Sequence, residues 1–358
     1  MKILFATNHA YLPHRVGGSE SSTHDLCLSL SERGIEVAVL CGISSSKLRP
    51  EFVPVRPSRR NGVTRDEIEA YPVFRARKPD LAVAEVACEL RPDVAVIQAG
   101  RPLLLAERFK AAGVPTIVYL RDALFEEIGG DVRALDGVAY AATSRDLGRR
   151  FAATFAIEPV CIPPLIRAQR YRVDSARTNV TFVCPHPLKG LDTALALAKQ
   201  RPDVPFAFVE SWRVHPLRRE VLRRRMPRNI VLRPPTLDMR SVYREAKIIL
   251  VPSRWVEAWG RVVSEAQISG IPALAARLGG LPESVGDGGV LINPDAPLEA
   301  WRDALSRLWD DPTEYARLAE RARRYSQRPE FQPDAILDRL LDFFAAVRDG
   351  RWARYSLG

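Results

Sequence analysis

Short apolar runs recur along both halves of this chain, and each is followed by a stretch with helical spacing of its apolar residues. Runs of about four to eight apolar residues bounded by turn signals are typical of buried strands in parallel sheets. Their alternation with helices predicts an α/β fold whose sheets are covered on both faces. In the N-terminal half we predict strands at residues 3–7, 35–40, 94–98, 116–120, 137–142 and 160–162. In the C-terminal half we predict strands at residues 180–184, 206–209, 230–232, 248–251, 273–275 and 290–292.

Two adjacent prolines, Pro163 and Pro164, separate these two series of strands and precede an arginine-rich segment. Two prolines stiffen the chain where it leaves the last strand of the first series, which is typical of a domain boundary. A chain of 358 residues with 46% hydrophobic content is large enough for two hydrophobic cores. We therefore predict an N-terminal domain at residues 1–163 and a C-terminal domain at residues 164–332. Residues 333–358 contain a further predicted helix whose apolar side carries Ile336, Leu337, Leu340, Leu341, Phe343 and Phe344.

Two loops of the N-terminal half are candidates for ligand contact. Gly17 and Gly18 follow the first predicted strand, and glycine permits close approach of the backbone to a ligand at the carboxyl end of a strand. A simple turn is the alternative. Residues 45–65 are rich in Pro, Arg and Ser, so we predict a surface loop that could act as a flap beside a bound substrate, with a loop that carries no chemistry as the alternative. No G-x-G-x-x-G occurs, which argues against a nicotinamide or flavin dehydrogenase.

The formal net charge of +10 does not indicate a nucleic-acid partner, because the basic residues are spread and no nucleic-acid-binding motif accompanies them. The densest basic cluster is typical of a solvated helix face, with contact to anionic lipid headgroups or an acidic polysaccharide as the alternative. It comprises Arg218, Arg219, Arg223, Arg224, Arg225 and Arg228.

Neither a membrane-spanning run nor a signal-peptide pattern occurs in the sequence. We therefore expect a cytoplasmic protein, with peripheral contact at the anionic inner face of the plasma membrane left open. The five cysteines are scattered, odd in number and free of C-x-x-C spacing, so we predict neither disulfides nor zinc.

Two carboxylates, Glu257 and Glu265, lie eight positions apart around Trp259 and Gly260, and helical spacing begins after Gly260. A helix start offers unpaired N–H donors that favour phosphate, whereas carboxylates accept hydrogen bonds from hydroxyl groups. A sugar nucleotide carries hydroxyls on both sides of a phosphate and fits this arrangement. Solvated helix-start charges are the alternative, because two acids at one spacing make a weak motif.

The segment at residues 252–272, PSRW-x-E-AWGRVVSEA-x-x-S-G-I-P, resembles the E-x7-E segment of retaining GT-B glycosyltransferases, in particular glycosyltransferase family four, the group 1 glycosyl transferases. The resemblance extends over nearly the whole chain, through the Gly17-Gly18 loop with Glu20, the RGIEVAVL strand, the Lys189-Gly190 pair and the GGLPE segment at residues 279–283. It implies a GT-B fold of two Rossmann-like doubly wound parallel-sheet domains. The donor site would lie in the cleft, and the last helix would cross back to the N-terminal domain.

The resemblance also implies roles for the matched residues. Glu257 is expected to bind hydroxyls of the donor sugar, Glu265 those of the ribose, and Lys189 to neutralise the donor diphosphate. As alternatives, Glu257, Glu265 and Lys189 could each be solvated residues near a helix start. No Asp-x-Asp pair occurs to hold a metal, so we expect neither a metal nor another cofactor.

Backbone amides are the second set of implied contacts. Trp259 and Gly260 match positions whose amides meet the sugar, and Arg261 and Val262 match positions whose amides meet the distal phosphate. Trp259 replaces a usual phenylalanine, and simple packing of its ring is the alternative. Gly17 and Gly18 complete the predicted donor-binding set.

The sequence departs from the family at two points. Arg121 stands where many relatives carry the histidine of a His-Asp pair; it could stabilise phosphate charge or hold an acidic acceptor, or simply pair with Asp122 or Glu126. Val183 and Cys184 stand where most relatives carry a phosphate-binding arginine, which leaves Arg261, Arg213 or Arg121 as possible substitutes.

The implied activity is that of a metal-independent, retaining hexosyltransferase, which moves a sugar from a nucleotide-sugar donor to an acceptor hydroxyl. The implied mechanism is front-face displacement, and the implied role is in polysaccharide, lipopolysaccharide or other glycan biosynthesis. The acceptor, a saccharide, a lipid-linked saccharide or a small molecule, is expected on the N-terminal domain around the Gly17-Gly18 loop and Arg121. Two alternatives stay open, a catalytically silent sugar-nucleotide or glycan-binding protein and a sugar-nucleotide epimerase of the same fold.

Overall fold

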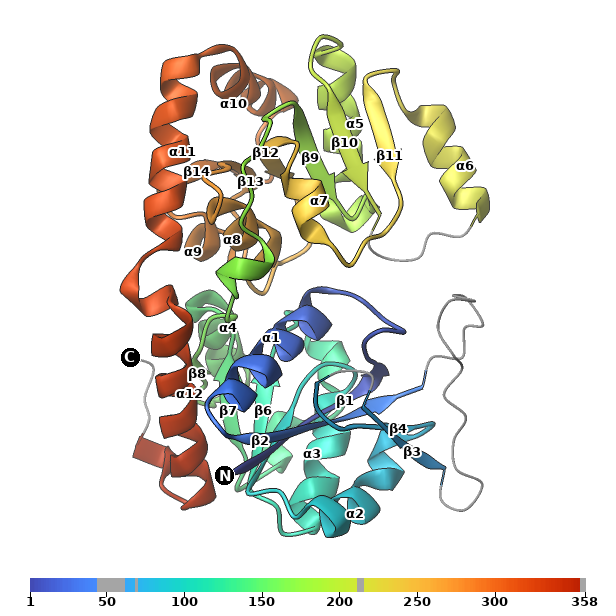
Figure 1. The fold of residues 1–358 in the computed structure, drawn as a ribbon, viewed down its shortest axis with the longest axis vertical. Coiled ribbons are helices and arrows are strands. Elements are labelled where there is room, and N and C mark those ends of the chain that lie inside the picture. The colour runs from blue at the N-terminus through green and yellow to red at the C-terminus, as the bar shows by residue number, and fades with distance from the viewer. Residues whose placement is uncertain (44–61, 68–69, 211–215, 355–358) are drawn as a thin grey trace. The chain divides into compact units, whose positions relative to one another are not determined.

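The computed structural model describes residues 1–43, 62–67, 70–210 and 216–354. The chain divides into two compact units (Figure 1): unit 1 comprises Met1–Leu165 with Pro333–Gly358, and unit 2 comprises Ile166–Gln332. The predicted boundary after residue 163 lies two residues before the observed one. Within the described residues, no helix combines the length and the apolar character that a membrane crossing requires.

Unit 1 is built on an eight-stranded sheet in the order β3-β4-β2-β1-β5-β6-β7-β8. Neighbouring strands are parallel except at one edge, where β3 and β4 pair antiparallel. The strands are β1 (Lys2–Ala10), β2 (Glu36–Gly42), β3 (Val63–Asp66), β4 (Val73–Ala76), β5 (Val94–Ile97), β6 (Thr116–Leu120), β7 (Ala139–Ala142) and β8 (Val160–Cys161). All the parallel strands predicted in this half are confirmed, with ends that differ by a few residues.

The β3-β4 hairpin was not predicted. The predicted loop at residues 45–65 is wrong at its end, because residues 63–65 belong to β3, while residues 44–61 lie outside the described part of the chain. The hairpin lacks an apolar run, since β3 reads VTRD and β4 buries Arg75 at 1% exposure. Arg75 is satisfied there by Asp66, whose carboxylate accepts from Nε at 2.5 Å, and by the Leu12 carbonyl at 2.8 Å.

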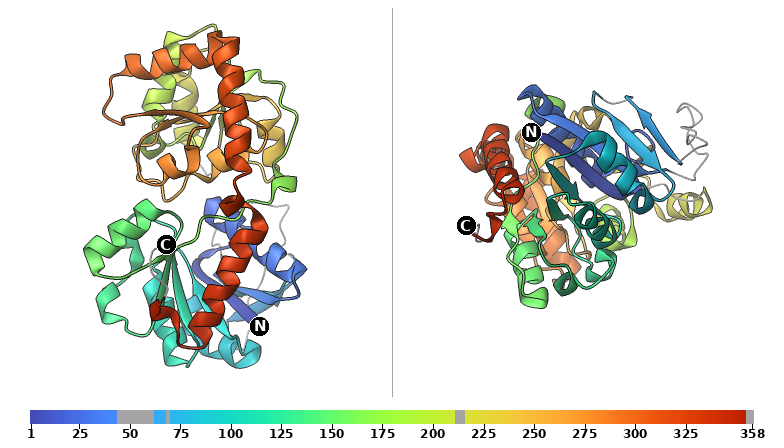
Figure 2. Two further views of the ribbon diagram at one scale, coloured as in Figure 1. Left: turned by 90° about the vertical axis from the view of Figure 1, so that its left-hand side faces the viewer. Right: turned by 90° about the horizontal axis from the view of Figure 1, so that it is seen from below.

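The helices of unit 1 are α1 (Gly18–Glu32), α2 (Pro79–Leu90), α3 (Pro102–Ala111), α4 (Arg145–Phe155) and α12 (Pro333–Arg348), with 3-10 turns at Phe125–Ile128, Val132–Ala134 and Trp352–Arg354. Helix α12 lies along the strands of unit 1 (Figure 2), and Ile336, Leu340 and Phe344 share a buried cluster with Ile3 and Phe5 of β1. The prediction that the last helix returns to the N-terminal domain is confirmed.

Unit 2 contains a six-stranded, wholly parallel sheet in the order β11-β10-β9-β12-β13-β14. Its strands are β9 (Asn179–Val183), β10 (Phe206–Val209), β11 (Ile230–Arg233), β12 (Ala246–Val251), β13 (Ala273–Ala276) and β14 (Gly289–Ile292). Its helices are α5 (Leu191–Gln200), α6 (Pro216–Arg225), α7 (Met239–Tyr243), α8 (Arg261–Gln267), α9 (Leu281–Val285), α10 (Leu298–Asp310) and α11 (Pro312–Ser326), with 3-10 turns η3 (Ala168–Arg170), η4 (Pro187–Lys189) and η5 (Pro329–Phe331). Every strand predicted in this half is confirmed.

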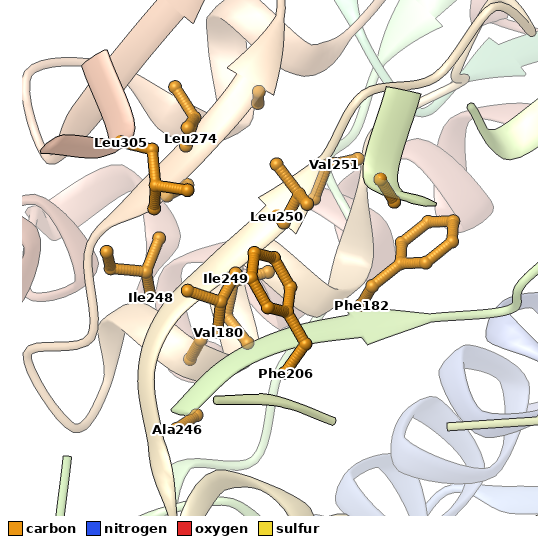
Figure 3. Close-up of a cluster of buried hydrophobic side chains, with 14 of the residues drawn as sticks. Val180, Phe182, Phe206, Ala246, Ile248, Ile249, Leu250, Val251, Leu274 and Leu305 are labelled. Carbon is orange, nitrogen blue, oxygen red and sulfur yellow. The ribbon is translucent and has the colours of Figure 1, made fainter. Parts of the chain in front are cut away.

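Strand β12 is buried on both faces in the core of unit 2. Ile248, Ile249 and Leu250 are consecutive, yet each is at most 1% exposed, because both faces of this central strand are covered. They lie among side chains of β9, β10 and α10 (Figure 3). The strand order reverses beside β9, which has β10 on one side and β12 on the other. Such a switch point places the loops after β9 and β12 next to each other, at the edge where ligands of open α/β sheets bind.

Candidate functional site

The loops after β9 and β12 bring Lys189 and Glu257 into contact. Lys189 ends the η4 turn, and its Nζ donates to Glu257 Oε1 at 2.7 Å. Ser253 Oγ donates to the same carboxylate oxygen at 2.5 Å. The side chains of Lys189 and Glu257 retain 18% and 14% exposure, so the ion pair is partly desolvated but still reached by solvent. Two residues predicted for one site from separate motifs are therefore brought together.

Gly190 allows the close approach of these two loops. Its φ is +83°, and a Cβ at this position would lie 1.9 Å from the Pro252 carbonyl oxygen. The Leu188 carbonyl accepts from the backbone N–H groups of Arg254 and Trp255 at 3.0 and 2.9 Å. Backbone contacts thus join the two loops directly, and a side chain at residue 190 would force them apart.

The Glu257 loop is held on another side by the turn at Gly279 and Gly280. The Gly280 N–H donates to the Glu257 carbonyl at 2.7 Å. A Cβ on Gly279 would lie 2.4 Å from that carbonyl oxygen, and one on Gly280 would lie 2.5 Å from the Ala258 carbonyl oxygen. Gly260, with φ +94°, packs similarly against Leu281. The backbone from Glu257 to Gly260 is therefore seated tightly against this turn.

Glu265 and Arg261 form a buried ion pair within α8. Arg261 Nε donates to Glu265 Oε1 at 2.5 Å, and Tyr243 donates to Glu265 Oε2 at 2.6 Å. Arg261 Nη2 donates to the Tyr171 hydroxyl at 2.6 Å. The two charged residues are only 8% and 4% exposed, and burial raises the pKa of Tyr243 well above its usual value. The Arg261 guanidinium is thus engaged by Glu265, and ribose binding by Glu265 stays a prediction.

Trp259 packs inside unit 2. The residue is 6% exposed, its Nε1 donates to Ser264 Oγ at 2.9 Å, and its ring meets the Phe331 ring edge to face at 5.5 Å and 84°. These contacts favour the packing interpretation of the indole ring. Any sugar contact at this position would come from the backbone, as would contacts from Gly260 and from Val262 in the first turn of α8.

In unit 1, Gly17, Gly18 and Arg121 lie close together at the start of α1. Gly17 precedes the helix and Gly18 is its first residue. Arg121 Nη1 donates to the Ser19 carbonyl at 3.1 Å and to Thr23 Oγ1 at 3.3 Å. Its guanidinium carbon lies 4.3 Å from the centroid of the Tyr119 ring. Arg121 therefore faces the first turn of α1, where the loop predicted to contact the acceptor ends.

Glu20 adds a buried acid to this region. It is 5% exposed and pairs with Arg15 Nε at 3.1 Å, and burial raises its pKa against the opposing effect of Arg15. A Cβ on Gly17 would lie 2.7 Å from Glu20 Oε2. The glycine therefore leaves room for this carboxylate.

A strained segment at residues 99–101 was missed from the sequence. All three residues have left-handed φ values, 53°, 62° and 59°, and the segment begins two residues after β5 ends at Ile97. Asn8 Nδ2 donates to the Gly100 carbonyl at 2.8 Å, and a Cβ on Gly100 would lie 2.8 Å from the His9 ring. Burial and the charge of Arg15 lower the pKa of His9 to about 4, so its ring is neutral near pH 7. Strain of this kind is concentrated at functional sites, and it lies beside the carboxyl end of β1.

The basic cluster predicted from the sequence lies on and just after α6. Several of its members pair with acids, as Arg219 does with Glu210, Arg224 with Glu220 and Arg225 with Asp192. These pairs favour the solvated-helix interpretation, and lipid contact stays a prediction. Arg213, one proposed substitute for the missing phosphate-binding arginine, lies outside the described residues. Within those residues, no group of three or more His, Cys, Asp or Glu could hold a metal ion.

Residues 186–325 match the family model "Glycosyl transferases group 1". The D-inositol 3-phosphate glycosyltransferase of Corynebacterium glutamicum is 47% identical over 92 residues, which are 25% of this chain and 21% of the relative. That of Xylanimonas cellulosilytica is 40% identical over 132 residues, which are 36% of this chain and 31% of the relative. These alignments span less than a third of either relative.

Solved structures match over nearly the whole chain. Anabaena Alr3699/HepE, in complex with UDP and glucose, has a TM-score of 0.76 at 18% identity, covering 97% of this chain and all of the other. Sucrose-phosphate synthase from Thermosynechococcus elongatus has a TM-score of 0.73 at 15% identity, covering 97% and 99%. At this identity the likeness concerns the fold alone, which is the predicted GT-B fold.

Proposed function

We propose that this chain is a hexosyltransferase-type glycosyltransferase, on the premise that residues 186–325 match the family model of the group 1 glycosyl transferases. It moves a sugar from a nucleoside-diphosphate sugar to an acceptor hydroxyl. The observation that carries the proposal is the contact of Lys189 with Glu257 at the switch point of unit 2, since both residues lie within the matched segment.

The geometry suits departure of a diphosphate. As the bond between the anomeric carbon and the phosphate oxygen breaks, negative charge develops on that oxygen, and a fixed cation in a partly desolvated site stabilises it. Lys189 supplies this cation. Glu257 accepts hydrogen bonds from sugar hydroxyls, and the backbone that Gly279 and Gly280 support keeps its carboxylate in place.

The proposed reaction retains configuration and needs no metal. The acceptor oxygen bonds to the anomeric carbon on the face that the diphosphate leaves, and the acceptor proton passes to the departing phosphate oxygen. Atoms and charge balance without a further reactant. The acceptor is a saccharide, a lipid-linked saccharide or a small molecule bound at unit 1, and we place the reaction in glycan biosynthesis in the cytoplasm.

A uridine diphosphate sugar is the donor to test first. Structures of Anabaena HepE contain UDP or UDP-glucose, which supports this choice by fold alone. The melting temperature of the purified protein is measured with UDP-, GDP-, ADP- and dTDP-sugars in the presence of EDTA. In a separate assay, release of nucleoside diphosphate is measured with a panel of acceptors. We expect stabilisation by one nucleotide series and release that depends on an acceptor.

The matched variants are Glu257→Gln, in the site, and Glu299→Gln, exposed at the start of α10. The first should lose most of the release and the second should retain it. A folded protein that no sugar nucleotide stabilises, and that releases nothing, would overturn the proposal. Stabilisation without release would support the silent binding protein, and a sugar converted without an acceptor would support the epimerase.

A further inference from the structure

The last segment of unit 2 packs against the loop that carries Glu257. In the η5 turn, the Phe331 ring meets the Trp259 ring at 5.5 Å and 84°, and the Tyr325 ring at 5.8 Å and 73°. The guanidinium carbon of Arg328 lies 3.5 Å from the Tyr325 centroid and 4.2 Å from the Phe331 centroid. We call Trp259, Phe331, Tyr325 and Arg328 the aromatic stack.

One end of the aromatic stack is fixed to the site. The Trp259 indole is held from α8 through Ser264 Oγ, and from η5 through Phe331. Trp259 is two residues from Glu257, and its Cα lies against Gly280, where an added Cβ would approach to 2.9 Å. A shift of the indole would therefore act on a backbone that packs closely against Gly280.

The other end is fixed to the body of unit 2. The Tyr325 hydroxyl donates to the Glu283 carbonyl at 2.7 Å. Gly286 packs closely against the Tyr325 ring, since a Cβ there would lie 1.9 Å from its Cε2. Edge-to-face aromatic pairs and cations over rings add orientation-dependent attraction to simple burial. Phe331 thus joins two anchored rings, and its place determines where the indole can sit.

We propose that Phe331 is a positioning residue for the donor site, acting through Trp259 on the placement of Glu257 relative to Lys189. The inference rests on the proposed function for its kinetic consequences. Phe331 lies two residues before Pro333, where α12 begins, so the chain segment that enters unit 1 also supports the donor loop.

The test compares the full chain with Phe331→Ala, Phe331→Tyr and Trp309→Ala. Trp309 is a matched control because it is a partly buried aromatic residue of unit 2 that packs on Lys247, away from the aromatic stack. Hydrogen exchange of the amides at residues 256–262, kcat/KM for the donor and thermal stability are measured for each variant. Hydrogen exchange reports on the loop whether or not the chain is an enzyme.

We expect Phe331→Ala to speed exchange at residues 256–262 and to lower kcat/KM for the donor about three- to tenfold. Phe331→Tyr, which keeps the ring, should have the exchange rate and the kcat/KM of the wild type. Trp309→Ala should lower thermal stability without changing the exchange rate or kcat/KM. If Phe331→Ala does not fold, Arg328→Ala should change the same two quantities in the same direction.

Unchanged exchange at residues 256–262 in Phe331→Ala, with thermal stability lowered as in Trp309→Ala, would reduce Phe331 to a packing residue and overturn the inference. Faster exchange with unchanged kcat/KM in an active protein would overturn it as well. Absence of donor binding and turnover in the wild type would instead contradict the proposed function, and the exchange result would then decide the inference by itself.

Discussion

Lys189 Nζ lies 2.7 Å from Glu257 Oε1, although 68 positions separate the two residues in the sequence. The contact exists because β9 and β12 are neighbours in the sheet and the two loops leave it at the same edge. An ammonium and a carboxylate that hold each other in place are already positioned before a ligand arrives. We therefore expect removal of a charge from this pair to lower kcat/KM more than it lowers the free energy of unfolding.

Replacement of Lys189 by Gln removes the cation but keeps much of the stem. We expect kcat/KM for the donor to fall about a hundredfold, the scale of one electrostatic stabiliser, while unfolding free energy changes by only about 1 kcal/mol. Lys199→Gln, exposed at the end of α5, is the control and should leave turnover unchanged. A Lys189→Gln protein with wild-type kcat/KM would remove Lys189 from the reaction.

Replacement of Gly190 by Ala tests the close approach of the two loops. The added Cβ meets the Pro252 carbonyl at 1.9 Å, so urea denaturation should show a loss of about 3 kcal/mol. Gly113 has a similar left-handed φ of +73° but open space around it, so Gly113→Ala should cost about 1 kcal/mol. Equal losses in the two variants would show that the backbone conformation, and not the contact with Pro252, limits residue 190.

Replacement of Glu265 by Ala leaves the buried Arg261 guanidinium without its carboxylate. Breaking a buried ion pair in this way costs about 3 kcal/mol, whereas Glu245→Ala, at the more exposed pair with Arg233, should cost about 1 kcal/mol or less. Chemical denaturation of both variants measures this difference. A Glu265→Ala protein as stable as the wild type would show that α8 does not depend on the pair. Loss of donor binding in this variant should therefore be interpreted only where the protein is shown to be folded.

His9 predicts a specific pH dependence. Its folded pKa, about 4, lies below the ordinary value of 6.5, so the unfolded chain takes up the proton first as the pH falls. Stability associated with neutral His9 is complete above about pH 6.5 and declines toward pH 4. Melting temperatures measured across this range should therefore fall more steeply in the wild type than in His9→Gln. Parallel curves for the two proteins would contradict the assigned pKa.

Much of the fold could be predicted because its strands are buried on both faces and read as uninterrupted apolar runs, as at residues 248–251. The β3-β4 hairpin could not, because edge strand β3 is mostly polar and Arg75, buried in β4, depends on Asp66 and on the distant Leu12 carbonyl. Burial of such a residue follows from tertiary contacts that no local pattern contains.

The site shows the same division. Lys189 and Glu257 each lie in a local motif, so both were named from the sequence. Tyr171, Tyr243 and Phe331 were missed, because each reaches the site from a distant segment and carries no motif of its own. For Trp259, the sequence could not decide between a sugar contact and packing of the indole. The contact that favours packing comes from the Phe331 ring, which the sequence around Trp259 does not indicate.

The contacts of Tyr171 and Phe331 define which residues a separately produced unit 2 must contain. The family match begins at residue 186 and ends at residue 325, yet Arg261 bonds to Tyr171 before that segment and Trp259 packs on Phe331 after it. A fragment trimmed to the match would contain every predicted donor residue of unit 2 and lack two of the side chains that orient them. Its ends should be placed outside residues 166 and 332, where the compact unit itself begins and ends.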